Sequence, residues 1–156
     1  MLPPLIADAF HTLPADLVAV CRPHSWEELT AVPGDGLRSV RDILVHLMDN
    51  EAGWVGHVVR GEPRRRFDPA AFDGLDSILA GWEPLRAASV ATILGLTEEA
   101  RRSRRPLPWD AAKTVSVEEI VWHIVGHDQY HRGQAFTRLA LLGRRDLPDH
   151  DLIRVA

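Results

Sequence analysis

The segment from Val117 to Leu142 constrains the fold most, because both of its ends and its interior predict one long helix. Ser116 and Glu119 form a capping box, in which each side chain satisfies a backbone N–H of the first turn. Gly143 suits the C-cap, since glycine adopts the left-handed conformation there without a Cβ penalty. Apolar residues fall at helical spacing between these ends. We therefore expect a helix over 117–142.

Three further long helices are predicted from similar signals. Ser39, with Asp42 as its capping partner, begins a helix that runs toward residue 58 or 59 and ends at Gly61-Glu62-Pro63. Periodic apolar residues indicate another over about 75–94, in which Pro84 either kinks the helix or marks a later start. The first helix lies within residues 3–20, with Pro14 as a kink or a restart.

The rest of the chain is interpreted as short turns and connections. Capped turns are expected at 25–28 and 97–99, and the segments 30–38, 61–73 and 104–115 are rich in Pro, Gly, Asp or Arg. No β-rich run with period-two alternation is present, nor an internal repeat. Four main helices in 156 residues predict an all-α four-helix bundle that forms a single domain over 1–156.

Charge and composition narrow the function classes. A net charge of −4 argues against nucleic-acid binding, so the basic clusters 64–66 and 101–105 are expected to be solvated loops. No apolar run approaches the roughly 18 to 20 residues that span a bilayer, and the N-terminus lacks the features of a signal peptide. We expect a cytoplasmic protein with no membrane partner. The lone cysteine, Cys21, is expected to be buried and inert.

The eight histidines are the unusual feature of the composition. On the helix over 117–142, the 3.6-residue period places His123, His127 and His131 in one sector with Ile120 and Ile124. Imidazoles therefore interrupt the stripe expected to face the bundle interior, where buried polar groups need partners.

A metal ion would satisfy these imidazoles, because His-x-x-x-His brings two rings side by side on a helix. The spacing allows either His123 with His127 or His127 with His131. His123 and His131 lie roughly 12 Å apart along the axis, too far to share one ion. The best third ligand is His46, at the edge of the apolar stripe of the second long helix. The alternative is a set of packed core histidines without an ion. The others, His11, His24, His57 and His150, are expected in loops or at the surface.

Two of these segments resemble a known family. The string from His123 to Gln134, with His127 and His131-Arg132-Gly133-Gln134, is similar to the last helix of the DinB-like (damage-inducible, YfiT-type) metalloproteins. The segment 39–51 resembles their second helix with its single ligand histidine, and residues 142–151 resemble their C-terminal pattern. The resemblance implies an up-down-down-up bundle, commonly a homodimer. It also implies one zinc or nickel ion held by His46, His127 and His131, with His123 as a packing or supporting residue.

The resemblance also implies candidate reactions. Relatives include enzymes that transfer low-molecular-weight thiols such as bacillithiol or mycothiol, and thiol-dependent isomerases. An ion with three protein ligands keeps open positions, where it lowers the pKa of a bound water or holds a thiol as thiolate. We expect a thiol S-transferase that acts on small electrophiles. The alternatives are a non-catalytic metal-binding stress protein and a metal-dependent hydrolase. Candidate residues that orient the ligands are Asp49, Asn50, Asp128 and Gln134.

Overall fold

The computed structural model describes residues 2–148 and 151, and four long helices form its body. In chain order the elements are α1 (Pro4–Cys21), α2 (Trp26–Thr30), α3 (Val40–Glu51), the π-helix η1 (Ala52–Val59), the 3₁₀ turn η2 (Pro69–Ala71), α4 (Leu75–Leu94), α5 (Glu98–Arg102), the strands β1 (Arg104–Leu107) and β2 (Asp110–Ser116), and α6 (Val117–Leu141).

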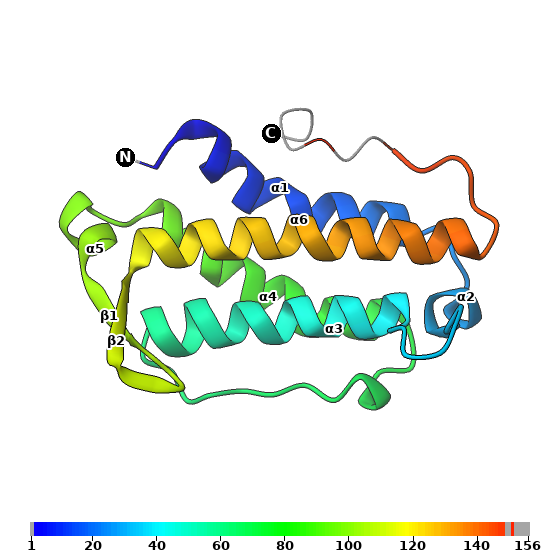
Figure 1. The fold of residues 1–156 in the computed structure, drawn as a ribbon, viewed down its shortest axis with the longest axis horizontal. Helices are drawn as coiled ribbons and strands as arrows, with labels where there is room; N and C mark the ends of the chain where they lie inside the picture. The colour runs from blue at the N-terminus through cyan, green and yellow to red at the C-terminus, as the bar shows by residue number, and fades with distance from the viewer. Residues whose placement is uncertain (1, 149–150, 152–156) are drawn as a thin grey trace.

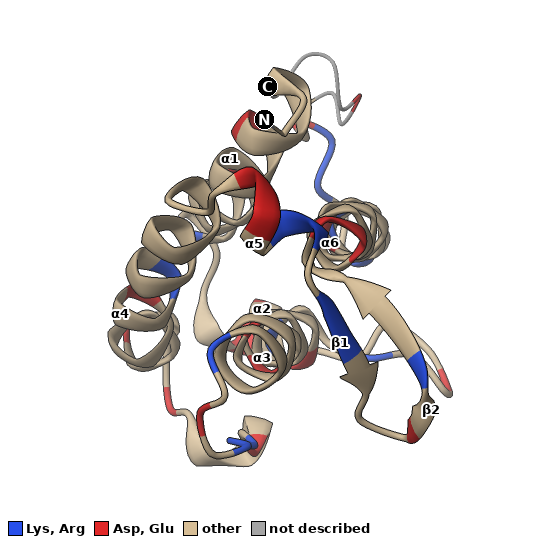
Figure 2. Ribbon diagram, turned by 90° about the vertical axis from the view of Figure 1, so that its left-hand side faces the viewer, with Lys and Arg blue, Asp and Glu red and all other residues tan. Residues whose placement is uncertain are grey.

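The helix directions confirm the predicted four-helix bundle. In Figure 1, α1 and α6 run in one direction along the bundle, and α3 and α4 run in the other. The connection 60–74 travels back along the length of α3, so α4 begins at the same end of the bundle as α3. Helix α6 packs against α1 and α3, and α3 also packs against α4. Seen along its axis in Figure 2, the bundle places α6 beside α3 and α1 beside α4.

Local capping signals predicted the helix ends well. In the box that begins α6, the Glu119 N–H donates to Ser116 Oγ at 3.1 Å and the Ser116 N–H donates to Glu119 Oε2 at 2.6 Å. Ser39 and Asp42 form the same arrangement at the start of α3. Gly143 has a φ of +97°, the left-handed conformation expected of a residue just past a helix. Pro84 lies inside α4 without ending it.

The second half of the predicted second helix is a π-helix, which the sequence did not indicate. Residues 52–59 follow α3 without a break, and the Arg60 N–H donates to the Val55 carbonyl at 3.0 Å, five residues back. Gly53 gives room here to the side chain of Arg64, since a Cβ at this position would lie 2.5 Å from Arg64 Nη1. Wide turns of this kind often lie near functional sites.

The interpretation of 104–115 as a plain connection, and of the chain as free of strands, is wrong. Strands β1 and β2 form an antiparallel ribbon in which Arg104 pairs with Ser116 and Pro106 with Thr114. Most of its side chains are exposed or half-buried, so it carries no alternating apolar pattern. The ribbon brings Trp109 within 5.7 Å of Trp54, ring centre to ring centre.

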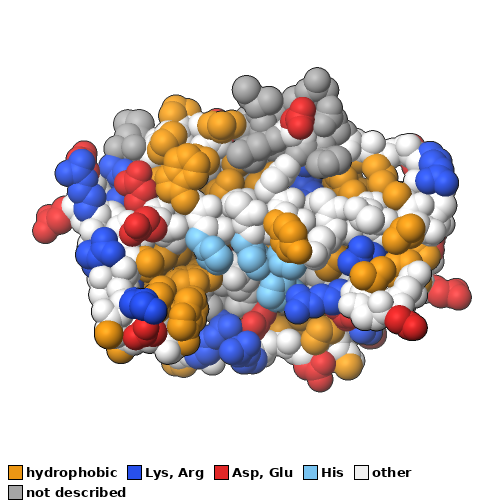
Figure 3. All heavy atoms as spheres, in the orientation of Figure 1, with side chains coloured by type: hydrophobic (Ala, Val, Ile, Leu, Met, Phe, Trp, Pro, Cys, Tyr) orange, Lys and Arg blue, Asp and Glu red, His pale blue; other side chains and the backbone are white. Residues whose placement is uncertain are grey.

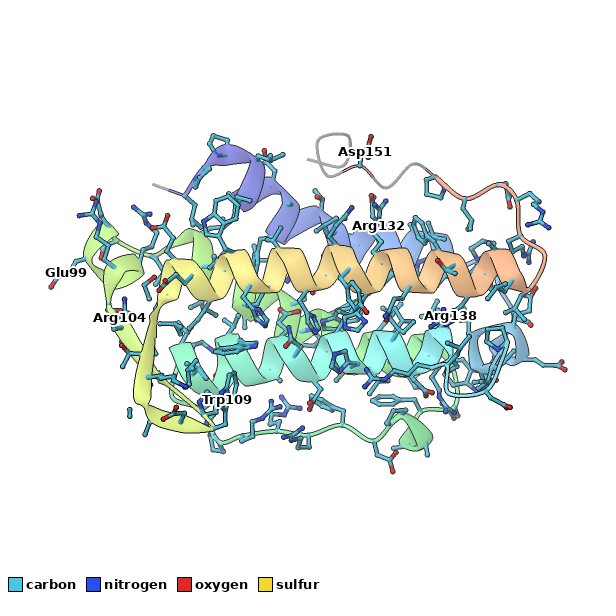
Figure 4. All side chains as sticks on the ribbon, in the orientation of Figure 1. Glu99, Arg104, Trp109, Arg132, Arg138 and Asp151 are labelled. Atoms are coloured by element: carbon cyan, nitrogen blue, oxygen red, sulfur yellow. The ribbon has the colours of Figure 1, made fainter. Side chains whose placement is uncertain are left out.

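The buried face of α6 is rotated from the face that the histidines suggested. Its core residues include Val121, Val125 and Phe136, whereas Leu141 is 60% exposed. Arg132 is buried on the side of α6 that faces α1, where its Nη2 lies 3.2 Å from Asp16 Oδ2 (Figure 4). The expected stripe is confirmed at Ile120, Ile124 and His131, which are buried, but the buried face also includes charged residues that the stripe did not contain.

Buried polar side chains of α3, α4 and α6 form a cluster that consists of Glu51, Trp82, Arg86 and Asp128. Glu51 is 3% exposed, accepts a hydrogen bond from Trp82 Nε1 at 2.9 Å, and lies 3.3 Å from Arg86 Nη1. The Arg86 guanidinium stacks over the Phe10 ring at 4.4 Å. Burial raises the pKa of Asp128 to about 8; the charge of Glu51 also raises it, and the Arg86 charge opposes the rise. Asp128 is therefore mostly protonated at neutral pH.

Two smaller expectations can be compared with the structure. His24 lies in the connection between α1 and α2, as expected of a loop residue, although its imidazole is only 4% exposed and lies 3.7 Å from Glu28. Arg101 is buried and pairs with Glu118 at 3.0 Å, so the basic cluster 101–105 is not wholly a solvated loop. His150 lies outside the described residues.

Helix α1 bears on the expectation of no membrane partner. Among the described residues it is long and apolar enough, by length and composition alone, to cross a membrane. Core helices of soluble proteins meet the same criterion. Here Ile6, Phe10 and Leu13 are buried within the bundle, where α1 packs against α6 and α4.

Candidate metal centre

Three histidines from α3 and α6 converge in the structure. His46 comes from α3, and His127 and His131 lie one turn apart on α6. Each offers one ring nitrogen, and these three atoms lie within 4.8 Å of one another. The Nε2 atoms of His46 and His127 are 3.1 Å apart. The space-filling view in Figure 3 shows histidine side chains gathered on this face, with Lys or Arg side chains directly beside them.

Gln134 fixes the orientation of one ring. Its Oε1 lies 2.9 Å from His131 Nδ1, one turn along the same helix. An amide oxygen can only accept, so Nδ1 carries the proton and the Nε2 lone pair is left free. Metal-bound histidines commonly donate their second N–H to such an acceptor. Gln134 therefore lies where a supporting residue was expected.

The electrostatics keep all three imidazoles neutral. Burial, the largest cause, together with the neighbouring His131, His46 and His123, lowers the pKa of His127 to about 3. Burial is also the main cause of the lowered pKa of His46 and of His131. Each neutral imidazole has one lone pair that a cation can accept, and without an ion the two Nε2 atoms 3.1 Å apart can share one hydrogen bond when one of the rings carries its proton there.

The donor set fits a divalent ion of borderline softness such as zinc. With Zn–N bonds of about 2.0 to 2.1 Å and tetrahedral angles, ligand nitrogens lie about 3.3 Å apart. The 3.1 Å pair matches this spacing, and the three nitrogens all lie within 4.8 Å of one another. Three protein ligands leave a coordination position for water or substrate, as in catalytic rather than structural zinc sites.

The other predicted residues lie at different distances from the three histidines. Asp49 is turned toward the connection 60–74, with its Oδ2 3.1 Å from Arg64 Nη2, although its charge raises the pKa of His46. Asn50 has a buried amide nitrogen with no hydrogen-bond partner among the described residues. Asp128 faces the buried Glu51–Arg86 cluster. The His123 ring lies 5.7 Å from that of His127 and 5.2 Å from that of Trp54, beyond the three-histidine set.

Several residues that the sequence did not single out line a pocket next to one of the three histidines, His46. A pocket of about 330 Å³ opens beside His46 and is lined also by Arg38, Val45 and Phe67. Arg38 was assigned to a plain connection, although it directly precedes the cap residue Ser39 and so lies at the helix start. Phe67 comes from the connection 60–74, whose path along α3 no local pattern indicates.

A larger pocket lies elsewhere and is a weaker candidate for chemistry. It measures about 570 Å³, lies between α1 and α4, and is lined largely by apolar residues. None of the three converging histidines lines it. The smaller pocket is the better candidate because it adjoins the potential ligands.

The bundle topology and the cluster of His46, His127 and His131 together define a class of helical proteins with a candidate metal site. The chain belongs to the DinB superfamily, whose family model matches residues 9–135. It is 21% identical to the uncharacterized protein YizA of Bacillus subtilis over 114 residues. This match covers 73% of this chain and 71% of YizA.

Two solved structures from Bacillus subtilis share the fold. YfiT, described as a probable metal-dependent hydrolase with an unusual four-helix bundle topology, superposes with a TM-score of 0.72 at 18% identity, over 90% of this chain and 87% of YfiT. The DinB-like protein YjoA superposes with a TM-score of 0.70 at 16% identity, over 93% of this chain and 96% of YjoA. The family predicted from the histidine motifs is thereby confirmed.

Proposed function

We propose that this protein is a metal-dependent enzyme that transfers a low-molecular-weight thiol to a small electrophile. The observation that carries the proposal is the convergence of three neutral imidazoles, from His46, His127 and His131, beside a pocket at the bundle surface. Zinc or nickel suits these nitrogen ligands.

The roles of the protein groups follow from their positions. The three imidazoles supply lone pairs without a change of protonation, because their pKa values are already lowered. Gln134 holds the His131 ring in the tautomer that frees Nε2. A bound divalent ion stabilises a thiol as its nucleophilic thiolate, or lowers the pKa of a water. The pocket beside His46 accommodates the electrophile next to this nucleophile.

A turnover assay tests the proposal. Zinc-loaded and nickel-loaded protein would be incubated with bacillithiol or mycothiol and a panel of small electrophiles, and conjugate formation followed by mass spectrometry. We expect conjugation that requires both metal and thiol and is lost in His46→Ala. His11→Ala, which removes an exposed histidine of α1, is the matched control and should retain activity. Absence of conjugation by the fully metal-loaded protein across the panel would contradict the proposal.

Hydrolysis is the second candidate, supported by the likeness to YfiT, which is described as a probable metal-dependent hydrolase. The same site would then activate water instead of a thiol. Turnover of esters or amides without added thiol would favour hydrolysis. A non-catalytic stress protein would instead unfold on chelation and show no exchangeable ligand at the metal. The homodimer implied by the resemblance stays a prediction, to be checked by light scattering.

A further inference from the structure

The pocket beside His46 has an unbalanced positive charge. Asp42 lines it but is already engaged, with its Oδ1 2.8 Å from Arg41 Nη2 and its Oδ2 accepting from the Ser39 N–H. Asp49 also lines it and is shared by Arg64 and Arg66, at 3.1 and 3.4 Å. Both carboxylates of the pocket are therefore neutralised by arginines.

Arg38 differs from those arginines because it has no acidic partner. Its side chain is exposed and lines the pocket, and its guanidinium makes no hydrogen bond or ion pair within the described part of the chain. The backbone at this position is held in place, since the Arg38 carbonyl accepts a hydrogen bond from Arg138 Nε at 3.2 Å. Ser39 then begins α3, so the guanidinium is carried by an anchored helix start.

The charge of Arg38 acts on the metal centre itself. It is close enough to lower the pKa values of His46, His127 and His131. A second cation beside a divalent ion is unfavourable, because like charges repel at short range. The arrangement becomes favourable when an anion lies between the ion and the guanidinium. The protein as a whole carries a net charge of −4, so this local excess of positive charge is not a general property of its surface.

We propose that Arg38 binds a carboxylate group of the substrate, and that the protein therefore acts on small organic acids that have an apolar body. This proposal rests on the proposed function, since the reacting part of the acid would lie at the metal. The guanidinium fork matches a carboxylate with two parallel hydrogen bonds. Val45, Phe67 and Pro69 supply the apolar wall of the same pocket, and its volume of about 330 Å³ suits a molecule about the size of a substituted benzoate.

Calorimetric titration of zinc-loaded protein with benzoate and with benzamide tests the proposal. Benzamide has nearly the same shape as benzoate but carries no charge. We expect Arg38→Gln to weaken benzoate binding about tenfold or more, the usual effect of losing a charge-assisted pair, and to leave benzamide binding unchanged. Arg38→Lys should fall between, because it restores the charge but not the fork. The matched control is Arg102→Gln, an exposed arginine of α5 paired with Glu98, which should bind both probes as wild type does.

Several results would overturn the proposal. Equal benzoate affinity in wild type and Arg38→Gln would show that Arg38 does not recognise the carboxylate. An equal loss for benzoate and benzamide would assign Arg38 to packing instead of charge recognition. The zinc content of the same samples distinguishes a failure of this inference from a failure of the proposed function. Full zinc with Arg38-independent benzoate binding contradicts this inference alone, whereas a wild type that binds no zinc contradicts the proposed function and this inference with it.

Discussion

Replacing Asp128 with asparagine should change how the stability of the protein depends on pH. The folded-state pKa of this carboxyl is about 8, against an ordinary value of 3.8. The folded-state pKa lies above the unfolded-state pKa. At pH values between these two, the native state therefore keeps a proton on Asp128 that the unfolded state has released. The contribution of Asp128 is therefore fully present below about pH 4 and is lost as the pH rises toward about 8.

The size of this loss follows from linkage. One extra proton held by the native state gives a slope of about 1.4 kcal/mol per pH unit. Between about pH 5.5 and pH 7.5, where the slope begins to flatten, wild type should lose about 2.5 kcal/mol from this group. Asparagine resembles the protonated acid in shape and does not titrate, so Asp128→Asn should lack this loss.

Urea unfolding at several pH values measures the effect. Both proteins would be held metal-free with a chelator, because metal binding is itself pH-dependent. The histidines titrate in both proteins, so their contribution cancels in the difference between the two profiles. Asp146→Asn, at an exposed position, is the control and should follow wild type. Parallel profiles for wild type and Asp128→Asn would refute the assignment of Asp128 as a buried, protonated acid.

Three further perturbations test other parts of the structure. Glu51→Ala should destabilise the protein by about 3 kcal/mol in urea unfolding, because it leaves the mostly buried Arg86 without its ion-pair partner. A loss of stability below about 1 kcal/mol would show that this ion pair is not needed. Gln134→Ala should weaken zinc affinity about tenfold or more in chelator competition, since the His131 ring loses its hydrogen-bond acceptor; unchanged affinity would remove Gln134 from the site. Ser116→Ala should cost about 1 kcal/mol in thermal unfolding through loss of the capping box, and an unchanged midpoint would count against the cap.

The long helices could be predicted from the sequence because their signals are local. Ser39 with Asp42 and Ser116 with Glu119 set the helix starts, and both boxes are present in the structure. Local spacing on one helix allowed either His123 with His127 or His127 with His131, and the family resemblance selected the second pair, which converges with His46 in the structure. His46 could be named as the best third ligand from its place at the edge of an apolar stripe, but its meeting with the other two histidines depends on the folded bundle.

The features that the sequence did not predict depend on contacts between distant segments. Asp128 and Arg132 look like surface residues of α6, but each is buried against charges from other helices. The stripe expected from the histidines was therefore incomplete, although its Ile120 and Ile124 are buried as expected. The role of Arg38 beside the pocket depends equally on the path of the 60–74 connection, which brings Phe67 to the same place.

The metal content of tag-free protein, compared between wild type and His127→Ala, tests the central claim most directly. Elemental mass spectrometry should find near-stoichiometric zinc or nickel in the wild type and its loss in a variant that stays folded by circular dichroism. Removing one of three ligands leaves only two nitrogens, too few for a tight site. A folded wild type that takes up neither metal would contradict the account and identify the histidine cluster as packing.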